Sequence, residues 1–358
     1  MPPLPRRELR NLVRKLGVAA RPADQRDALA TLVALCRDSD SRTAIATAGA
    51  IPELVELLGH GVQAGVQQDA AGALMSLAMN AANKIAIADA DAISPLVKLL
   101  GPGASAEVQQ KAAGALMNLA SDAVNKVMIA AAGAIPPLVY LLGPGFAALV
   151  QRRAAGGLMR LAANDDNQVT IAKAGAIPPL VQLLGLGSRA GVQQKAAGAL
   201  MNLAVNADNV VSIATAGTIP PLVQLLGAGS SAGVQENAAG AVRNLSANAG
   251  NSVAIADAGA IPLLVQLLGR SSPAIVQQDA AVTLTNLASN TENAVTITAA
   301  GAIPALEQLL RSSSDVDTRW FASRALVFLV DSNAGSVAVI GTAEANAEAQ
   351  EAMGALRI

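Results

Sequence analysis

Residues 108–120 read Val-Gln-Gln-Lys-Ala-Ala-Gly-Ala-Leu-Met-Asn-Leu-Ala, and residues 132–136 read Ala-Gly-Ala-Ile-Pro. The first string returns unchanged at residues 192–204. The second recurs with a step of 42 residues, and its glycine position falls on Gly49, Asp91, Gly133, Gly175, Gly217, Gly259 and Gly301. A period of this size predicts stacked helical units, none of which can bury its apolar faces alone.

The unit at residues 121–162 shows what each repeat is expected to contain. A short helix is predicted to begin at Asn125 and to end at Gly133, because glycine accepts the left-handed turn that follows a helix. Prolines at 136–137 then occupy the first turn of a second helix, where the missing N–H costs little. Apolar spacing of 3.6 residues predicts a longer third helix over 148–162. The first-helix residues expected to face inward are Val127, Ile129 and Ala130.

This order of helices resembles the armadillo repeat of importin-alpha and beta-catenin, in which the second helix opens with Gly-Ala-Ile-Pro. The resemblance covers roughly residues 25–340. It implies an all-α fold, a right-handed α-α superhelix (an armadillo-repeat solenoid) of 42-residue three-helix repeats. HEAT repeats are the nearest alternative, but they lack the glycine break between two short helices that precede a long one.

The ends of the chain depart from the repeat, as capping units must. We expect an N-terminal tail and capping helix over residues 1–24 and an array over 25–342, with a partial first repeat and about seven 42-residue units. A C-terminal capping helix or tail is expected over residues 343–358. In the N-terminal helix, the residues predicted to share one face are Leu9, Leu12, Val13 and Leu16.

The composition excludes several classes of protein. The formal net charge of −1 argues against nucleic-acid binding, which requires a basic stripe. Two uncharged stretches, 127–150 and 209–235, are apolar enough to suggest membrane spans, but their prolines and glycines leave pieces too short to cross a bilayer. We therefore expect no membrane insertion. The single cysteine suits a reducing compartment, and a cytoplasmic or nuclear location is expected.

Catalytic and metal-binding motifs are absent from the sequence. His60 is the only histidine, and it is expected in a turn after a second helix. Cys36 has no histidine partner in the repeat frame, so a buried structural thiol is expected. No residues have metal-ligand spacing. The chain is therefore predicted to be neither an enzyme nor a cofactor-binding protein.

The resemblance to armadillo proteins implies a concave groove in which third-helix asparagines bond the backbone of an extended partner. The aligned positions are Ala34, Ser76, Asn118, Arg160, Asn202, Asn244, Asn286 and Phe328. Asparagine is unfavourable inside a helix, so its recurrence requires a reason. Either these amides bond a partner, the hypothesis that we favour, or they bond neighbouring repeats.

One turn earlier, glycine stands where the family has tryptophan. The five central repeats carry Gly72, Gly114, Gly156, Gly198 and Gly240. The aromatic slots that hold Lys and Arg stems in nuclear-import adaptors are therefore missing. Each glycine costs about 1 kcal/mol relative to alanine in a helix. Close helix packing and close approach of a ligand backbone are the two explanations.

A further turn earlier, three cations stand in the middle of the array: Lys111, Arg153 and Lys195. Arg160 joins them from the asparagine position. They form either a solvated helix face or a surface that selects acidic residues of a partner.

The last long helix carries the aromatic cluster, formed by Phe321, Arg324 and Phe328 with Trp320 beside them. This apolar spot is either covered by residues 343–357 or an anchor pocket for a partner, since aromatic residues and arginine often carry binding energy.

Two further series are assigned structural roles. An asparagine series is expected to cap the first helices: Asn83, Asn125, Asn167, Asn209, Asn251 and Asn293. A methionine series is expected to pack between repeats: Met75, Met117, Met159 and Met201.

The favoured function is a monomeric adaptor whose partner is a protein or peptide. Its groove, about 60–70 Å long, would hold an extended segment of about 20 residues. Two alternatives remain open. One is a structural, self-associating protein whose groove is covered by its own basic N-terminal residues. The other is an engineered or consensus-like scaffold without an evolved partner, since the repeats are nearly identical.

Overall fold

The computed structural model describes residues 4–17, 20–313 and 315–334. Within these ranges the regular structure is entirely α-helical, with no strand. The chain comprises two compact units, Met1–Leu180 and Val181–Ile358, which we call unit 1 and unit 2. The predicted all-α armadillo-type repeat is confirmed in both.

The helices of unit 1 follow the predicted order of short, short and long. They are α1 (Arg6–Arg14), α2 (Pro22–Leu35), α3 (Ser39–Thr47), α4 (Ala50–Glu56), α5 (Ala64–Leu77), α6 (Ala81–Asp89), α7 (Ile93–Lys98), α8 (Ala106–Leu119), α9 (Ala123–Ala131), α10 (Ile135–Tyr140), α11 (Ala148–Leu161) and α12 (Asp165–Lys173). Helix α13 (Ile177–Gln182) contains the boundary between the units.

Unit 2 repeats the same order. Its helices are α14 (Ala190–Leu203), α15 (Ala207–Thr215), α16 (Ile219–Leu225), α17 (Ala232–Leu245), α18 (Ala249–Asp257), α19 (Ala260–Leu267), α20 (Ala274–Leu287), α21 (Thr291–Ala299), α22 (Ala302–Ser312) and α23 (Val316–Ala334).

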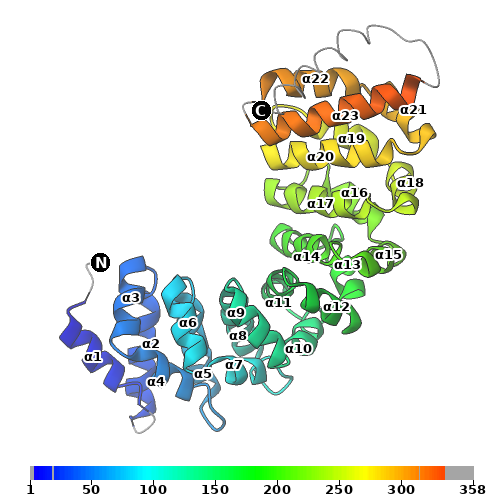
Figure 1. Cartoon of the computed structure of the whole chain (residues 1–358). Coiled ribbons are helices and arrows are strands. Elements are labelled where there is room, and N and C mark those ends of the chain that lie inside the picture. The colour runs from blue at the N-terminus through cyan, green and yellow to red at the C-terminus, as the bar shows by residue number, and fades with distance from the viewer. Residues whose placement is uncertain (1–3, 18–19, 314, 335–358) are drawn as a thin grey trace. The chain divides into compact units, whose positions relative to one another are not determined.

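The third helices of successive repeats pack side by side within each unit. They are α5, α8 and α11 in unit 1, and α14, α17, α20 and α23 in unit 2 (Figure 1). In α8 the buried residues include Ala112, Ala113, Leu116 and Leu119. Alanine at two of these positions lets neighbouring helices approach closely, while leucine fills the space between layers.

The unit at residues 121–162 matches its prediction in the second and third helices and departs from it in the first. Gly133 adopts the left-handed conformation with φ 79°. Ile129 is buried, but Val127 is 53% exposed, so the prediction that Val127 faces inward is wrong. Residues two apart on a helix point about 200° away from each other, and both cannot lie against the core.

The second asparagine series does not cap the first helices, and that prediction is wrong. The caps lie three residues earlier: Asn80 Oδ1 accepts a hydrogen bond from the backbone N–H of Asn83 at 3.1 Å. The Asn83 side chain instead donates to the carbonyls of Leu77 and Arg42, both at 3.2 Å. A capping side chain must precede the first turn. The displaced series is Asn83, Asn125, Asn167, Asn209, Asn251 and Asn293, and the observed caps are Asn80, Asp122, Asn164, Asn206, Asn248 and Asn290.

A glutamine in the first turn of the third helices α2, α5, α8, α11, α14, α17 and α20 hydrogen-bonds the end of the helix before it. Gln109 Nε2 donates to the carbonyls of Leu100 at 3.3 Å and Gly101 at 2.8 Å. The last carbonyls of a helix lack N–H partners within that helix, and the glutamine side-chain amide supplies the missing donor. The same paired bond is made by Gln25, Gln67, Gln151, Gln193, Gln235 and Gln277.

At the N-terminus, α1 buries Leu9 and Val13 and packs against α2 and α3. At the other end, α23 continues to Ala334, and the predicted C-terminal cap at 343–358 lies outside the described residues. In the described part of the chain, no single helix is long and apolar enough to cross a membrane. Helices α18 and α19 meet the length and composition criteria only as a pair, and they bend by 91°.

Candidate functional site: the third-helix face

The glycines one turn before the asparagine positions form slots for side chains from both neighbouring repeats. At Gly114, an added Cβ would collide with Met75 Sδ from α5 and would lie 3.5 Å from Arg153 Cδ of α11. At Gly240 in unit 2, it would lie 2.5 Å from Met201 Sδ and 3.4 Å from Asp279 Oδ2. Close packing, the first of the two explanations for these glycines, is therefore observed at both positions.

The asparagine amides bond neighbouring repeats in both units. Asn118 Nδ2 donates to the Met75 carbonyl at 2.8 Å, and Asn244 Nδ2 donates to the Met201 carbonyl at 2.9 Å. Asn286 Nδ2 reaches Ser246 Oγ at 3.0 Å. The second of the two possibilities that the sequence left open is therefore observed. Each bond occupies one of the two amide hydrogens, and a carboxamide has an oxygen acceptor besides.

The remaining members of that series take different positions. Ser76 Oγ donates to the Gly72 carbonyl of its own helix at 3.0 Å. Asn202 lies half-buried on α14. Arg160 replaces the asparagine on α11, and its Nε is buried without a hydrogen-bond partner among the described residues.

Three cations converge on the third-helix face of unit 1. Lys111 lies on α8, and Arg153 and Arg160 lie two turns apart on α11. None of the three makes an ion pair within the part of the chain that the structure describes. The Arg153 Nε is also buried without a hydrogen-bond partner there. Burial lowers the pKa of the Arg153 guanidinium, and Arg152 beside it contributes in the same direction.

Lys195, the third cation of the predicted stripe, lies half-buried on α14 of unit 2. The structure thus groups Lys111 with Arg153 and Arg160 within unit 1.

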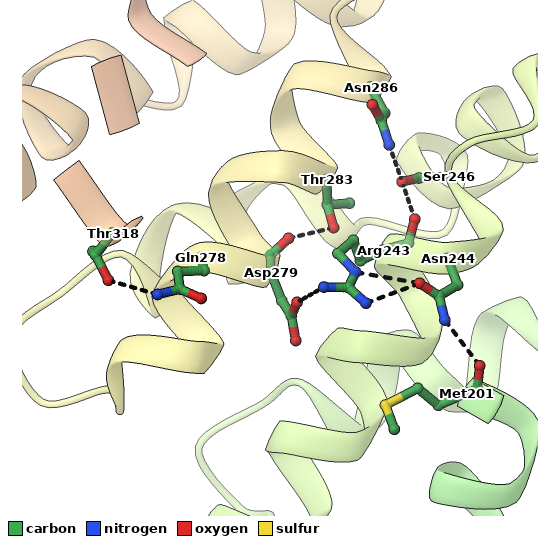
Figure 2. A network of polar contacts seen from close by, with 9 residues as sticks. All are labelled: Met201, Arg243, Asn244, Ser246, Gln278, Asp279, Thr283, Asn286 and Thr318. Atoms are coloured by element: carbon green, nitrogen blue, oxygen red, sulfur yellow. Dashed lines mark hydrogen bonds and ion pairs between the residues drawn. The ribbon is translucent and has the colours of Figure 1, made fainter. Parts of the chain in front are cut away.

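Unit 2 carries an internal ion pair on the same face (Figure 2). Arg243 Nη1 of α17 lies 2.8 Å from Asp279 Oδ1 of α20, whose side chain is only 5% exposed. Arg243 also donates from Nε and Nη2 to Asn244 Oδ1 at 3.2 and 3.1 Å. Both the cation and the asparagine acceptor are therefore engaged within the chain.

The carboxyl of Asp279 is strongly perturbed by its surroundings. Burial raises its pKa to about 6, Arg243 opposes this shift, and the negative charge of Glu236 adds to it. The desolvation of the carboxylate thus outweighs the attraction of its ion-pair partner.

The aromatic residues singled out in the sequence lie on α23, where Trp320 contacts both Phe321 and Arg324. The rings of Trp320 and Phe321 meet edge to face with centroids 4.8 Å apart, and the Arg324 guanidinium lies 5.3 Å from the Trp320 centroid. Trp320 and Phe328 are 38% and 37% exposed. The segment 343–357, which was expected to cover this cluster, lies outside the described residues.

Comparisons with known proteins agree with this repeat geometry. The model of the Armadillo/beta-catenin-like repeat matches residues 80–121, 164–205, 206–247 and 248–289. The solved structure of a "Designed armadillo repeat protein YIII(Dq)4CqI" is 32% identical, with a TM-score of 0.60, over 66% of this chain and 99% of that one. This chain belongs to the armadillo-repeat family. The armadillo fold is generally a non-enzymatic scaffold that binds proteins or peptides.

Two other solved structures are similar to this armadillo protein. A crystal structure of an engineered protein is 35% identical, with a TM-score of 0.80, over 90% of this chain and 78% of that one. A designed armadillo repeat protein in complex with the peptide (KR)4 is 32% identical, with a TM-score of 0.58, over 66% of this chain and 99% of that one. A search of curated proteins found no match.

The sequence analysis did not predict two structural features of this armadillo array. Arg243 and Asp279 stand 36 residues apart, outside the repeat register, so the repeat alignment does not pair them. The glutamine in the first turn of these third helices recurs in the sequence. The repeated sequence does not indicate, however, which backbone carbonyls its side chain reaches.

The described residues contain no group of three His, Cys, Asp or Glu side chains that could hold a metal ion. Cys36 is buried as expected, and desolvation raises the pKa of its thiol to about 12, against a smaller opposite effect of Arg42. A thiol so strongly protonated at neutral pH is a poor nucleophile.

Proposed function

We propose that this protein is an interaction adaptor that binds an extended, acidic segment of a partner along its third-helix face. The observation that carries the proposal is the unit 1 cation group of Lys111, Arg153 and Arg160, which has no ion-pair partner among the described residues. Two of its Nε atoms are buried and lack hydrogen-bond acceptors there. A partner carboxylate would pair with the Nη groups of these arginines and with the Lys111 ammonium, because arginine binds carboxylates through paired hydrogen bonds.

Asn118 provides the backbone contact in this proposal. Its Nδ2 holds the Met75 carbonyl, which orients the amide. Its Oδ1 accepts no hydrogen bond within the described residues, so it can accept a backbone N–H of an extended peptide. Asn202 and Asn286, on the third helices of unit 2, are proposed as further polar contacts, with Ser76 as a shorter one in unit 1. Asn244 can contribute only its second amide hydrogen, because its Oδ1 already accepts hydrogen bonds from Arg243.

The charge of the partner follows from the same group. The designed relative binds a peptide of alternating Lys and Arg, whereas unpaired cations on this face would repel such a peptide. Lys195 is proposed to add to the attraction for acidic residues, and the aromatic cluster of Phe321, Arg324 and Phe328 is proposed as an apolar anchor.

The test is fluorescence anisotropy with an extended peptide of alternating Glu and Ser residues. Each exposed charge pair contributes about 0.2–1 kcal/mol, so reversing Lys111, Arg153 and Lys195 together to Glu should abolish measurable binding. The affinity of the parent protein should also fall as salt rises, because screening weakens charge attraction.

Lys98→Glu is the matched control, because Lys98 is an exposed cation on the second helix α7. It should leave the affinity unchanged. An affinity and salt dependence that survive the triple reversal would refute the acidic-partner proposal, and so would a preference for (KR)4.

A second candidate is a scaffold with no evolved partner. It is favoured by the similarity to engineered and designed proteins together with the near-identical repeats. Failure of acidic peptides to bind, with a monomer in light scattering, would support it. A concentration-dependent mass would instead support self-association. For either candidate we propose a cytoplasmic or nuclear location, which the single buried cysteine suits.

A further inference from the structure

The first helices of unit 1 carry a second surface, apart from the third-helix face. On α9, Val124, Val127 and Met128 are 67%, 53% and 41% exposed, and Ile85 on the adjacent α6 is 54% exposed. Residues three and four apart share one side of a helix, so the three side chains of α9 form a continuous apolar strip. Helices α6 and α9 contact each other (Figure 1), and Ile85 holds in α6 the repeat position that Val127 holds in α9, 42 residues later.

Two lysines accompany these apolar side chains. Lys84 precedes Ile85 on α6, and Lys126 precedes Val127 on α9. Neither lysine makes an ion pair within the described ranges of the chain. We call the surface formed by Lys84, Ile85, Val124, Lys126, Val127 and Met128 the α6–α9 patch.

The two helices of the patch are held in register by buried amides. Asn125 Nδ2 donates to the Lys84 carbonyl at 3.1 Å, which ties α9 to α6. Asn83 makes the equivalent bond to the Arg42 carbonyl of α3 at 3.2 Å. These bonds fix the spacing of the lysines and of the apolar residues beside them, so the α6–α9 patch is preorganised.

Acidic residues limit the extent of the patch. Asp165 and Asp166 stand in the first turn of α12, and Asp89 ends α6. Asp122 caps α9, where its carboxylate accepts the backbone N–H groups of Val124 and Asn125, both at 3.0 Å. The basic and apolar surface is therefore about two helices wide, or about 20 Å.

We propose that the α6–α9 patch docks an acidic amphipathic helix of another protein, independently of the third-helix face. Three turns of helix span about 16 Å, which matches a footprint across α6 and α9. Apolar residues spaced three or four apart would cover Ile85, Val127 and Met128. Acidic residues on the flanks of the helix would meet Lys84 and Lys126.

A helix suits this surface better than a membrane or a second copy of the chain. Binding to an anionic bilayer usually takes a cluster of about four to eight basic residues, whereas the α6–α9 patch carries only Lys84 and Lys126. A second copy would bring Lys84 and Lys126 against the same lysines, because an isologous interface pairs identical patches.

The experiment uses a helix-stapled peptide of about 14 residues, with Leu at positions i, i+3, i+4 and i+7 and Glu on both flanks. Its binding to the full chain is followed by fluorescence anisotropy. Val127→Asp and, separately, Lys126→Glu should each weaken binding by about tenfold, or about 1.4 kcal/mol. Val127 is exposed, so Val127→Asp should leave the urea midpoint unchanged.

Val211→Asp is the matched control, because Val211 is the residue of α15 that corresponds to Val127 and is 56% exposed. The repeat position of Lys126 is occupied by Val210 in α15, so no lysine stands beside Val211. Binding should be unchanged in this variant. A scrambled peptide of the same composition should not bind.

Several results would overturn the proposal. One is the absence of saturable binding, and another is equal weakening by Val211→Asp. Weakening by Lys111→Glu with Arg153→Glu, but not by Val127→Asp, would place the peptide on the third-helix face instead. Adsorption to phosphatidylserine vesicles that Val127→Asp removes would indicate a membrane surface. A dimer that Val127→Asp dissociates would indicate a second copy.

Discussion

The third-helix faces of the two units are built on the same repeat but treat their charges differently. In unit 1, Arg153 and Arg160 have no ion-pair partner among the described residues, and each has a buried Nε without an acceptor there. In unit 2, Arg243 is paired with Asp279 at 2.8 Å and also occupies Asn244 Oδ1.

The comparison shows that the cations of an armadillo array can be paired within the chain or left without an ion-pair partner among the described residues. Asn118 and Asn244 make the same bond to a methionine carbonyl. Asn244 Oδ1 also accepts hydrogen bonds from Arg243, whereas Asn118 Oδ1 accepts none among the described residues. The family position alone therefore does not define a binding residue.

The largest expected effect is a difference in unfolding free energy between variants that remove Arg243 and Arg153. Arg243→Ala leaves the buried Asp279 carboxylate without its cation. Because the Arg243 side chain is 38% exposed, the expected loss is about 2 kcal/mol, between that of an exposed and that of a buried ion pair. Arg153→Ala removes an unpaired, partly desolvated cation, and the loss of its packed stem should change stability by less than about 1 kcal/mol. Urea denaturation at pH 7.5 measures both. Equal midpoints for the two variants would contradict the difference between the units.

The next effect is the pH dependence that Asp279 gives to unit 2. Burial raises its folded pKa to about 6 from an ordinary value of 3.8. The folded chain therefore binds a proton between pH 6 and 4 that the unfolded chain does not, and the free energy of unfolding falls as pH rises through that window. From pH 4.5 to pH 7.5 this amounts to about 2 kcal/mol.

Asp279→Asn isolates that contribution, because asparagine resembles the protonated carboxyl and does not titrate. The difference in unfolding free energy between parent and variant should change by about 2 kcal/mol between pH 4.5 and pH 7.5, with the variant gaining on the parent as pH rises. A difference that is independent of pH would contradict the raised pKa.

The repeat frame and the element boundaries could be predicted because they depend on local chemistry. Gly133 ends a helix, and the prolines at 136–137 begin one, wherever they occur. The same local reasoning failed at Asn83. An asparagine near the start of a helix can either cap the helix or, as the third helical residue, bury its amide and bond other carbonyls. Only the position of the Leu77 and Arg42 carbonyls distinguishes them.

The register of the repeat gives the candidate site residues, but it does not give their contacts within the chain. Lys111, Arg153 and Asn118 were found from the register of the repeat. The bond from Asn118 to Met75 and the pair between Arg243 and Asp279 depend on how adjacent repeats pack. Such distances depend on how side chains of adjacent repeats pack, as Met75 does against Gly114 and Met201 against Gly240, and the repeated sequence does not specify this packing.

The smallest expected effect uses the glycine slots. A Cβ at Gly72 would meet only the Lys111 stem, at 3.6 Å, whereas a Cβ at Gly114 would collide with Met75 Sδ. Gly72→Ala should therefore raise stability by about 0.5–1 kcal/mol through helix propensity. Gly114→Ala should gain nothing or lose stability, and Gly240→Ala should behave like it. Thermal unfolding measures the three variants, and a uniform gain would contradict the packing of methionine into these slots.

The most direct test of the account is a crystal structure of the protein bound to an extended acidic peptide. We expect the peptide on the third-helix face of unit 1, with a backbone N–H on Asn118 Oδ1 and carboxylates on Arg153 and Arg160. A peptide whose carboxylates lie away from Arg153 and Arg160, or one bound outside the third helices, would contradict the proposal that unpaired cations define the binding site.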